Sequence, residues 1–202
     1  GCLVFAVALA VAFRGPRPSP RTMAIVVLLG TIACQAAAFR SAPATSTDAW
    51  HYVWDGRVQL SGVSPYRYVP GDDALAHLRD PILFPGLGPD EASGIDTKWP
   101  LPQSEVFARA KNQPWTVLSR PGVPTIYPPV AQAWFALIAA VTPWSAGAIG
   151  VNLGAGLLAV VVAGLLVWLL IGLGRNPTWA ALWGWSPTVA VETSANGHVD
   201  VL

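Results

Sequence analysis

Residues 48–59 (DAWHYVWDGRVQ) bring together side chains that can act as acid, base and cation. At 100° per residue, one side of a helix over this stretch collects polar groups within about 60°: Asp48, Tyr52, Asp55 and Gln59. The other side is apolar: Trp50, Trp54 and Val58. A carboxylate on such a helix can act as a general base, and His51 or Arg57 can stabilise a negative charge.

This pattern predicts an amphipathic helix that lies in a membrane interface, with its Trp side toward lipid and its carboxylates toward protein or water. Arg57 lies near the lipid side and is expected to snorkel to a phosphate. An ordinary surface helix with solvated carboxylates and interfacial Trp is the competing interpretation.

A second polar group follows an apolar segment near residue 190. It consists of Glu192, Asn196, His198 and Asp200. An ionisable residue at the edge of a span is a candidate functional residue. Glu192, Asn196 and Asp200 share one face if the helix continues, but Gly197 can end it, and a simple polar helix end is the alternative. His198 and Asp200 are also possible ligands of a divalent cation, and the metal requirement stays open.

Two tyrosines stand in turn-forming sequence. Tyr66 in GVSPY can hold a hydroxyl-rich ligand, although a structural turn is the competing interpretation. Tyr127 in TIYPP comes just before a helix that the Pro pair is suited to begin, and interfacial belts of Tyr explain it without a catalytic role.

The composition of the 202 residues favours a membrane protein. The chain is 53% hydrophobic and 11% charged, with a mean hydropathy of +0.47, whereas soluble domains carry about 25% charged residues. The same figures exclude a disordered chain. A net charge of +1 gives no basic field for nucleic acid, and two Cys make neither a disulfide framework nor a Cys-based zinc site.

Apolar and charged blocks alternate, and they predict an all-α, polytopic transmembrane helix bundle over residues 1–202. The apolar segments cover residues 1–13, 22–39, 128–143, 147–173 and 178–191. The second has about the length needed to cross a bilayer. The chain begins inside an apolar run without Met and ends without a polar tail, so we expect it to be the N-terminal part of a larger, incomplete membrane domain.

The arginines predict the orientation. Arg14, Arg17 and Arg21 lie between the first two apolar segments, and such loops are cytoplasmic. The segment 22–39 then runs outward, and the Pro-rich loop 40–127 lies outside, where we expect it to fold on the membrane surface. If 128–143 spans the bilayer, Arg175 is outside. If 128–143 is re-entrant, Arg175 is cytoplasmic and the 192–200 group returns outside. The residues alone leave both alternatives open, and the family resemblance given next favours the second.

The order of these motifs resembles a known family. The matching pieces are Asp48, Tyr52, Trp54-Asp-Gly-Arg-Val-Gln59, Pro65-Tyr66, Leu78-Arg-Asp80, Thr125-Ile-Tyr-Pro-Pro129, Ala131-Gln132 and Asn196-Gly-His-Val-Asp200. Together they resemble the multi-pass glycosyltransferases of the GT-C superfamily, especially bacterial, above all actinobacterial, mannosyltransferases that use a polyprenyl-phosphate sugar. His51 stands where the family pattern has Arg, and the stretch 81–124 is expanded.

The resemblance implies an enzyme of the bacterial cytoplasmic membrane with its active site outside. A hexose, mannose by resemblance, passes with inversion from a polyprenyl phosphate to a glycan or glycolipid. By resemblance Asp48 is the first candidate for the base and Asp55 the second. The expected substrate-binding residues are His51, Tyr52, Arg57, Tyr66, Tyr127, Glu192, Asn196, His198 and Asp200. No cofactor is certain, although a divalent cation is possible.

Two other classes of function stay open. A transporter or flippase of lipid-linked glycans also holds ionisable residues in the membrane, although transporters usually contain internal repeats, and none is visible here. A non-catalytic membrane scaffold keeps the helices but does not need carboxylates clustered at one interface.

Overall fold

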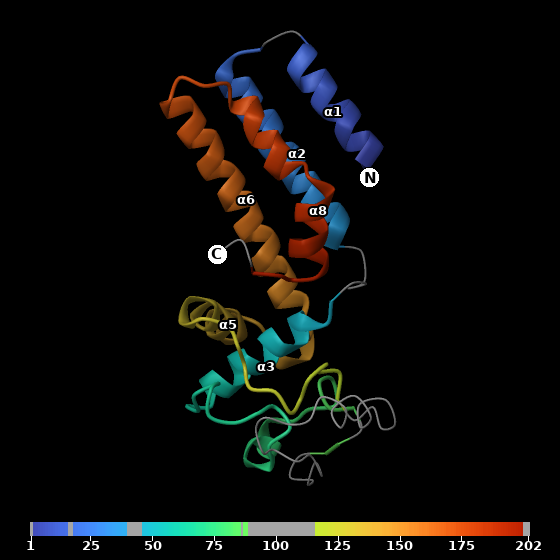
Figure 1. The fold of residues 1–202 in the computed structure, drawn as a ribbon, viewed down its shortest axis with the longest axis vertical. Coiled ribbons are helices and arrows are strands. Elements are labelled where there is room, and N and C mark those ends of the chain that lie inside the picture. Colours follow the sequence, from blue (N-terminus) through green and yellow to red (C-terminus); the bar gives the residue numbers. More distant parts are fainter. Residues whose placement is uncertain (1, 16–17, 40–45, 86, 89–115, 200–202) are drawn as a thin grey trace. The chain divides into compact units, whose positions relative to one another are not determined.

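The computed structural model describes residues 2–15, 18–39, 46–85, 87–88 and 116–199 (Figure 1). Helices make up 67% of these residues, and no strand occurs among them, so the expected all-α class is confirmed. The chain forms two compact units. We call Gly1–Thr45 with Asn152–Leu202 the terminal unit, and Ser46–Val151 the inserted unit.

Three apolar helices dominate the terminal unit: α1 (Cys2–Arg14), α2 (Pro20–Phe39) and α6 (Ile149–Gly172), whose first residues belong to the inserted unit. α2 and α6 have 20 and 24 residues and are long and apolar enough to cross a bilayer. At a rise of about 1.5 Å per residue, α2 alone reaches about 30 Å. α1 has 13 residues and is apolar but shorter.

The expected apolar segment 178–191 is not one helix. The chain there forms η3 (Pro177–Ala180), α7 (Ala181–Gly184), α8 (Pro187–Ala190) and the π-helical turn η4 (Val191–Ala195). Ser186 is extended, with ψ 123°, and Pro187 begins α8. Because proline has no backbone N–H and favours an extended residue before it, the helix restarts at this point.

Small residues let these pieces pack closely on α2. Val27 of α2 is buried with Val167 of α6 and Ala180–Ala181 of η3 and α7. A Cβ at Gly30 would lie 2.3 Å from the Trp185 Nε1. That indole nitrogen donates to the Val27 carbonyl oxygen over 3.0 Å, so glycine at position 30 is required for this contact.

The two ends of the terminal unit differ in chemistry. At one end the ring of Phe13, at the end of α1, lies 4.8 Å from the ring of Trp179 in η3. Arg14 and Arg175 therefore belong to the same end. At the opposite end the Asn152 Nδ2, in the first turn of α6, donates to the Ala195 carbonyl oxygen over 3.2 Å. That end also carries the last turns of α2, through the contacts of Gln35 with η4.

In the inserted unit, α3 (Asp48–Leu60) packs against α5 (Pro129–Val141). The ring of Tyr52 stacks on that of Phe135, with centroids 4.4 Å apart. A Cβ at Gly56 would lie 2.5 Å from the Phe135 carbonyl oxygen, so glycine permits the close approach of the two helices. α5 has 13 residues; it is too short to be one of the two candidate spans.

The Trp side of α3 does not face lipid, so that prediction is wrong. Trp54 is 1% exposed and Val58 is 3% exposed. Both pack in a core with Phe84 and with residues of η1 (Asp73–Leu78), a 3-10 helix. The period of α3 correctly gives two faces, but the chain that follows the helix folds back and covers the apolar one.

The described parts of the long loop form this cover. The Val117 N–H donates to the Leu83 carbonyl oxygen over 2.9 Å, and the Gly71 N–H donates to the Pro121 carbonyl oxygen over 2.7 Å. These bonds join the described residues that precede the stretch 89–115 to those that follow it. Residues 40–45, 86 and 89–115, and with them most of the expanded stretch 81–124, lie outside the described residues.

Candidate functional site

The first turn of α3 gathers a carboxylate, an imidazole and a guanidinium. Asp48 opens the helix and is half-buried, and a carboxylate is favourable there because the helix dipole is positive at that end. His51 lies one turn further, with its Nε2 3.3 Å from the Ser119 Oγ. Arg120 follows Ser119, and both are exposed. We call Asp48, His51, Ser119 and Arg120 the open cluster.

Electrostatics couple the members of the open cluster. Burial lowers the pKa of His51 to about 4; Asp48 opposes this shift, and Arg120 adds to it. The imidazole is therefore neutral at neutral pH. The cluster then presents a carboxyl group, a neutral hydrogen-bonding ring and a guanidinium group. This set can accept a proton at Asp48 and hold an anion at Arg120.

Asp55, two turns along the same helix, has very different surroundings. It is 4% exposed. Its Oδ2 accepts a hydrogen bond from the Gln132 Nε2 over 2.8 Å, and that nitrogen also donates to the Thr125 Oγ1 over 2.8 Å. The Gln59 Nε2 in turn donates to the Gln132 Oε1 over 2.8 Å. We call Asp55, Gln59, Thr125 and Gln132 the closed cluster.

Burial raises the pKa of Asp55 to about 6, although hydrogen bonds from Thr125 and Gln132 favour the charged form. A raised pKa is common in catalytic carboxyl groups. Here, however, the carboxylate joins α3 to α5 and is almost inaccessible, so a substrate hydroxyl does not reach it in this conformation. The geometry ranks Asp48 ahead of Asp55 as a base.

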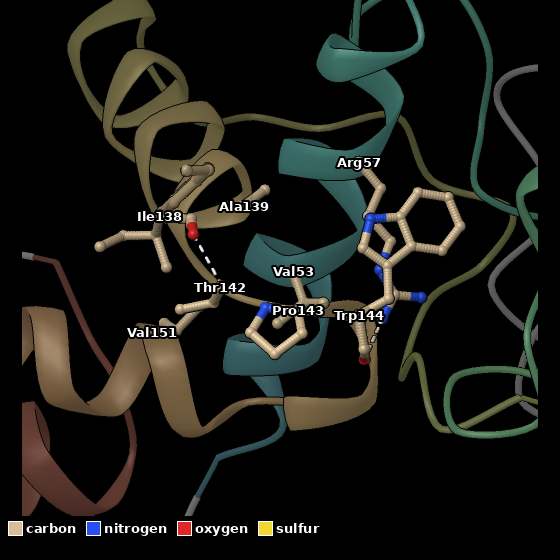
Figure 2. A pocket seen from close by; sticks show the side chains of 9 residues that line it. Val53, Arg57, Ile138, Ala139, Thr142, Pro143, Trp144 and Val151 are labelled. Carbon is tan, nitrogen blue, oxygen red and sulfur yellow. Dashed lines mark hydrogen bonds between the residues drawn. The ribbon is translucent and has the colours of Figure 1, made fainter.

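Arg57 does not snorkel to the interface, and that prediction is wrong. Its side chain is 1% exposed and forms an ion pair with Asp80. Its Nη2 donates to the Trp144 carbonyl oxygen over 2.9 Å, and the guanidinium carbon lies 4.7 Å from the centre of the Trp144 ring. Figure 2 shows the guanidinium beside the Trp144 indole. Burial lowers its pKa, and Asp80 opposes the shift.

The cavity beside Arg57 does not accommodate a sugar. Its volume is about 10 Å³, and Val53, Ile138 and Thr142 are among the residues around it (Figure 2). This is close to the space that a single water molecule requires. Arg57 therefore holds the inserted unit together, whereas Arg120, which acts electrostatically on His51, is exposed.

The three candidate tyrosines hold turns and helices together. Tyr52 is 2% exposed and lies between Phe135 and Tyr127, whose ring centroid is 4.9 Å away. Tyr66 is exposed, and its hydroxyl donates to the Tyr127 carbonyl oxygen over 2.6 Å. This contact favours the structural-turn interpretation of Tyr66. The edge of Tyr66 stays accessible, so a role in binding stays a prediction.

Glu192 connects the second polar group within the terminal unit. Its Oε2 accepts from the Asn196 Nδ2 over 3.2 Å and lies 2.9 Å from the His198 Nδ1. The expected sharing of a face by Glu192 and Asn196 is confirmed. Gly197, with φ 72°, ends the helix, because only glycine adopts this conformation freely. Asp200 lies outside the described residues.

Gln35 of α2 anchors this group, and the sequence interpretation missed it. It is 5% exposed, and its Oε1 accepts from the Thr193 and Ser194 hydroxyls over 2.8 and 2.6 Å. A Cβ at Gly156 would lie 2.3 Å from the Ser194 Oγ. π-helical turns are frequent at functional sites. Here contacts with α2 and α6 hold the π-helical turn η4 in place. A lone Gln in an apolar helix was the available signal.

Arg120 and Gln132 were also missed as partners of the candidate acids. Arg120 stands 69 positions from His51, and no local spacing relates the two. Gln132 was quoted as part of a motif, but its bond to Asp55 spans 77 positions. Within the described residues, no group of three His, Cys, Asp or Glu is placed to hold a metal ion. The possible divalent cation stays a prediction.

Comparison of the chain with models of protein families, with curated proteins and with solved structures found no match.

Proposed function

We propose that this chain is part of a membrane glycosyltransferase. It moves a hexose, mannose by resemblance, from a polyprenyl phosphate to a glycan or glycolipid outside a bacterial cytoplasmic membrane. The observation that carries the proposal is the open cluster. The half-buried Asp48 and the exposed Arg120 both act electrostatically on the neutral His51, and such a set is suited to transfer from an anionic leaving group.

The chemistry needs one proton acceptor and one cation. The Asp48 carboxylate takes the proton of an acceptor hydroxyl while that oxygen attacks the anomeric carbon. The bond between the anomeric carbon and the phosphate oxygen breaks, and its electron pair stays with the lipid phosphate. Because that phosphate leaves as an anion, Arg120 stabilises it. A single displacement inverts the anomeric centre, in agreement with the expected stereochemistry.

The terminal unit supports the proposed orientation. Arg14 and Arg175 share one end, at the contact of Phe13 with Trp179, and arginine-rich ends are cytoplasmic. α2 ends, and α6 begins, at the end that carries Glu192. The chain between them is the inserted unit. The end of the terminal unit that carries Glu192 is therefore the proposed outer end.

The same end supports a role for the second polar group. Glu192, Asn196 and His198 form one hydrogen-bonded patch around the π-helical turn η4. Carboxylate, amide and imidazole groups are the side chains that bind sugar hydroxyls well. We assign the half-buried Glu192 and His198 to binding of the glycan or glycolipid, whereas Asn196, which is 0% exposed, positions the Glu192 carboxylate.

A flippase of lipid-linked glycans is the second candidate. It is favoured by the broken segment from Pro177 to Ala195, since transporters build their sites from discontinuous helices. The two candidates differ in product. A transferase makes a new glycosidic bond, whereas a flippase moves the donor and leaves it intact.

The test is transfer by the full-length protein in proteoliposomes that hold labelled polyprenyl-phosphate hexose and a glycan acceptor. We expect labelled acceptor from the wild type, and a rate about 10²- to 10⁴-fold lower from Asp48→Asn. Asp72→Asn is the matched control, because Asp72 is also half-buried at a helix start and should keep the wild-type rate. Wild-type turnover by Asp48→Asn would contradict the proposal.

A further inference from the structure

The arginine-bearing end of the terminal unit contains a cavity that the proposed reaction does not use. Its volume is about 480 Å³, within the range of small-molecule sites. One wall comes from the end of α1 and the beginning of α2, with Phe13 and Met23. The other comes from the turn after α6, with Arg175, Asn176 and Trp179.

Among the described residues of the terminal unit, this end carries exposed arginines and no carboxylate. Arg175 lines the cavity and is exposed. Arg14 and Arg21 are also exposed, and each directly follows a residue that lines the cavity. The sequence has no Asp or Glu in residues 1–47 or 106–191. In the described part of the terminal unit, Glu192 is the one carboxylate, and it belongs to the opposite end.

The cavity also has an apolar wall. Phe13 and Trp179 are in ring contact, Met23 lines the same space, and Trp179 is 54% exposed. Tryptophan at this level of a spanning helix is typical of the boundary between headgroups and acyl chains. An occupant therefore meets cations on one side and an apolar surface on the other.

We infer that this cavity binds the phosphate headgroup of an anionic phospholipid. The shared chemistry is a phosphate oxyanion, and the apolar wall selects the lipid over free phosphate. Arg175 forms the ion pair inside the cavity, while Arg14 and Arg21 attract the anionic leaflet. Basic pockets between membrane helices on the cytoplasmic side bind such headgroups. The inference does not depend on the transferase proposal.

The test uses the full-length protein in neutral detergent and follows its melting temperature. Phosphatidylglycerol is titrated in one arm, phosphatidylcholine in a second and inorganic phosphate in a third. We expect a saturable rise with phosphatidylglycerol and none with the other two. Arg175→Gln should weaken the apparent affinity for phosphatidylglycerol about fivefold, and Arg175→Lys should recover part of it.

Arg67→Gln is the matched control, because Arg67 is an exposed arginine of the inserted unit and should leave the affinity unchanged. If Arg175→Gln fails to fold, the double variant Arg14→Gln/Arg21→Gln provides the same test, with an expected loss of affinity. An equal loss in Arg67→Gln would overturn the inference. So would an equal rise with phosphatidylcholine, or saturation by inorganic phosphate alone.

Discussion

The first and third turns of α3 contain similar side chains in opposite surroundings. In the first turn, Asp48 and His51 are half-buried, and an exposed Arg120 acts electrostatically on His51. In the third turn, Asp55 and Arg57 are 4% and 1% exposed, and each is bonded to another segment of the inserted unit. Burial thus separates a partly accessible group from a group that holds the fold.

Residue type and spacing therefore do not decide which side chains of one helix bind a ligand and which hold the fold. Asp55 and Arg57 have the chemistry of a site, but α5 and the loop after α3 use that chemistry for assembly. Removing one partner from such a buried pair costs more than the pair contributes, since the other charge stays behind. The open turn should tolerate substitution structurally and lose function, whereas the closed turn should do the reverse.

The largest effect on stability is expected for Asp80→Asn. This change leaves the buried Arg57 without its ion-pair partner and should lower the free energy of unfolding by about 3–5 kcal/mol. Asp72→Asn is the control. Both aspartates accept backbone N–H groups, but Asn replaces a helix cap well, so its effect should be small. Chemical unfolding in detergent measures the free energy of unfolding of both variants. Equal losses would show that the ion pair with Asp80 does not give Arg57 a structural role.

Arg120→Gln should impair catalysis without destabilising the protein. A hydrogen bond to a charged group is worth about 1.5–3 kcal/mol, so kcat/KM for the polyprenyl-phosphate donor should fall about 10- to 100-fold. Arg67→Gln, another exposed arginine, should leave it unchanged. Steady-state kinetics with varied donor measures the ratio. An unchanged kcat/KM in Arg120→Gln would show that a different cation stabilises the leaving lipid phosphate.

Gly56→Ala tests how tightly the closed turn is packed against α5. The new methyl group would meet the Phe135 carbonyl oxygen at 2.5 Å and the Ala139 Cβ at 2.8 Å, and overpacking of this kind costs about 1–3 kcal/mol. Gly164→Ala is the control, because nothing lies within 4 Å of a Cβ at that helical position. The melting temperature should fall in the first variant and stay the same or rise in the second. Equal shifts would show that α3 and α5 are not in close contact.

The smallest expected effect is on the pH dependence of stability, because two opposite contributions offset one another in the wild type. Asp55 has its pKa raised to about 6, so its contribution to stability is present below about pH 4 and is lost as the pH rises through 6. His51 has its pKa lowered to about 4, so its contribution is present above about pH 6.5 and is lost as the pH falls through 4. Between pH 4 and 6 the two slopes oppose one another.

Single variants should separate these slopes. Relative to wild type, Asp55→Asn should make stability rise with pH by up to about 1.4 kcal/mol per unit between pH 4 and 6. His51→Gln should make it fall over the same window. Melting curves across this range measure both variants. Parallel pH profiles in all three proteins would contradict the assigned protonation states.

The helices and their periodicity could be predicted from the sequence, because hydrophobic patterning is local. The apolar segments matched α1, α2, α5 and α6 closely, and the two faces of α3 were recognised. The break at Ser186-Pro187 had a local signal that the apolar composition obscured. The folding of the loop over Trp54 had no local signal, because it depends on a backbone hydrogen bond between Val117 and Leu83, which are 34 positions apart.

The candidate site was predictable in its residues but not in their partners. Asp48 and His51 follow from one helical turn, and Glu192 and Asn196 from another. Arg120, Gln132 and Gln35 come from distant segments, so only the fold places them. The sequence therefore identified both Asp48 and Asp55 as candidate bases. It could not show that Gln132 and Thr125 enclose Asp55.

The most direct test of this account compares the turnover of Asp48→Asn with that of Asp55→Asn in full-length protein at pH 7.5, each preparation having a measured melting temperature. Asp48→Asn should melt like the wild type and lose about 10²- to 10⁴-fold in rate. Asp55→Asn should keep most of its turnover while its melting temperature shifts. Loss of turnover in Asp55→Asn, with Asp48→Asn still active, would contradict it.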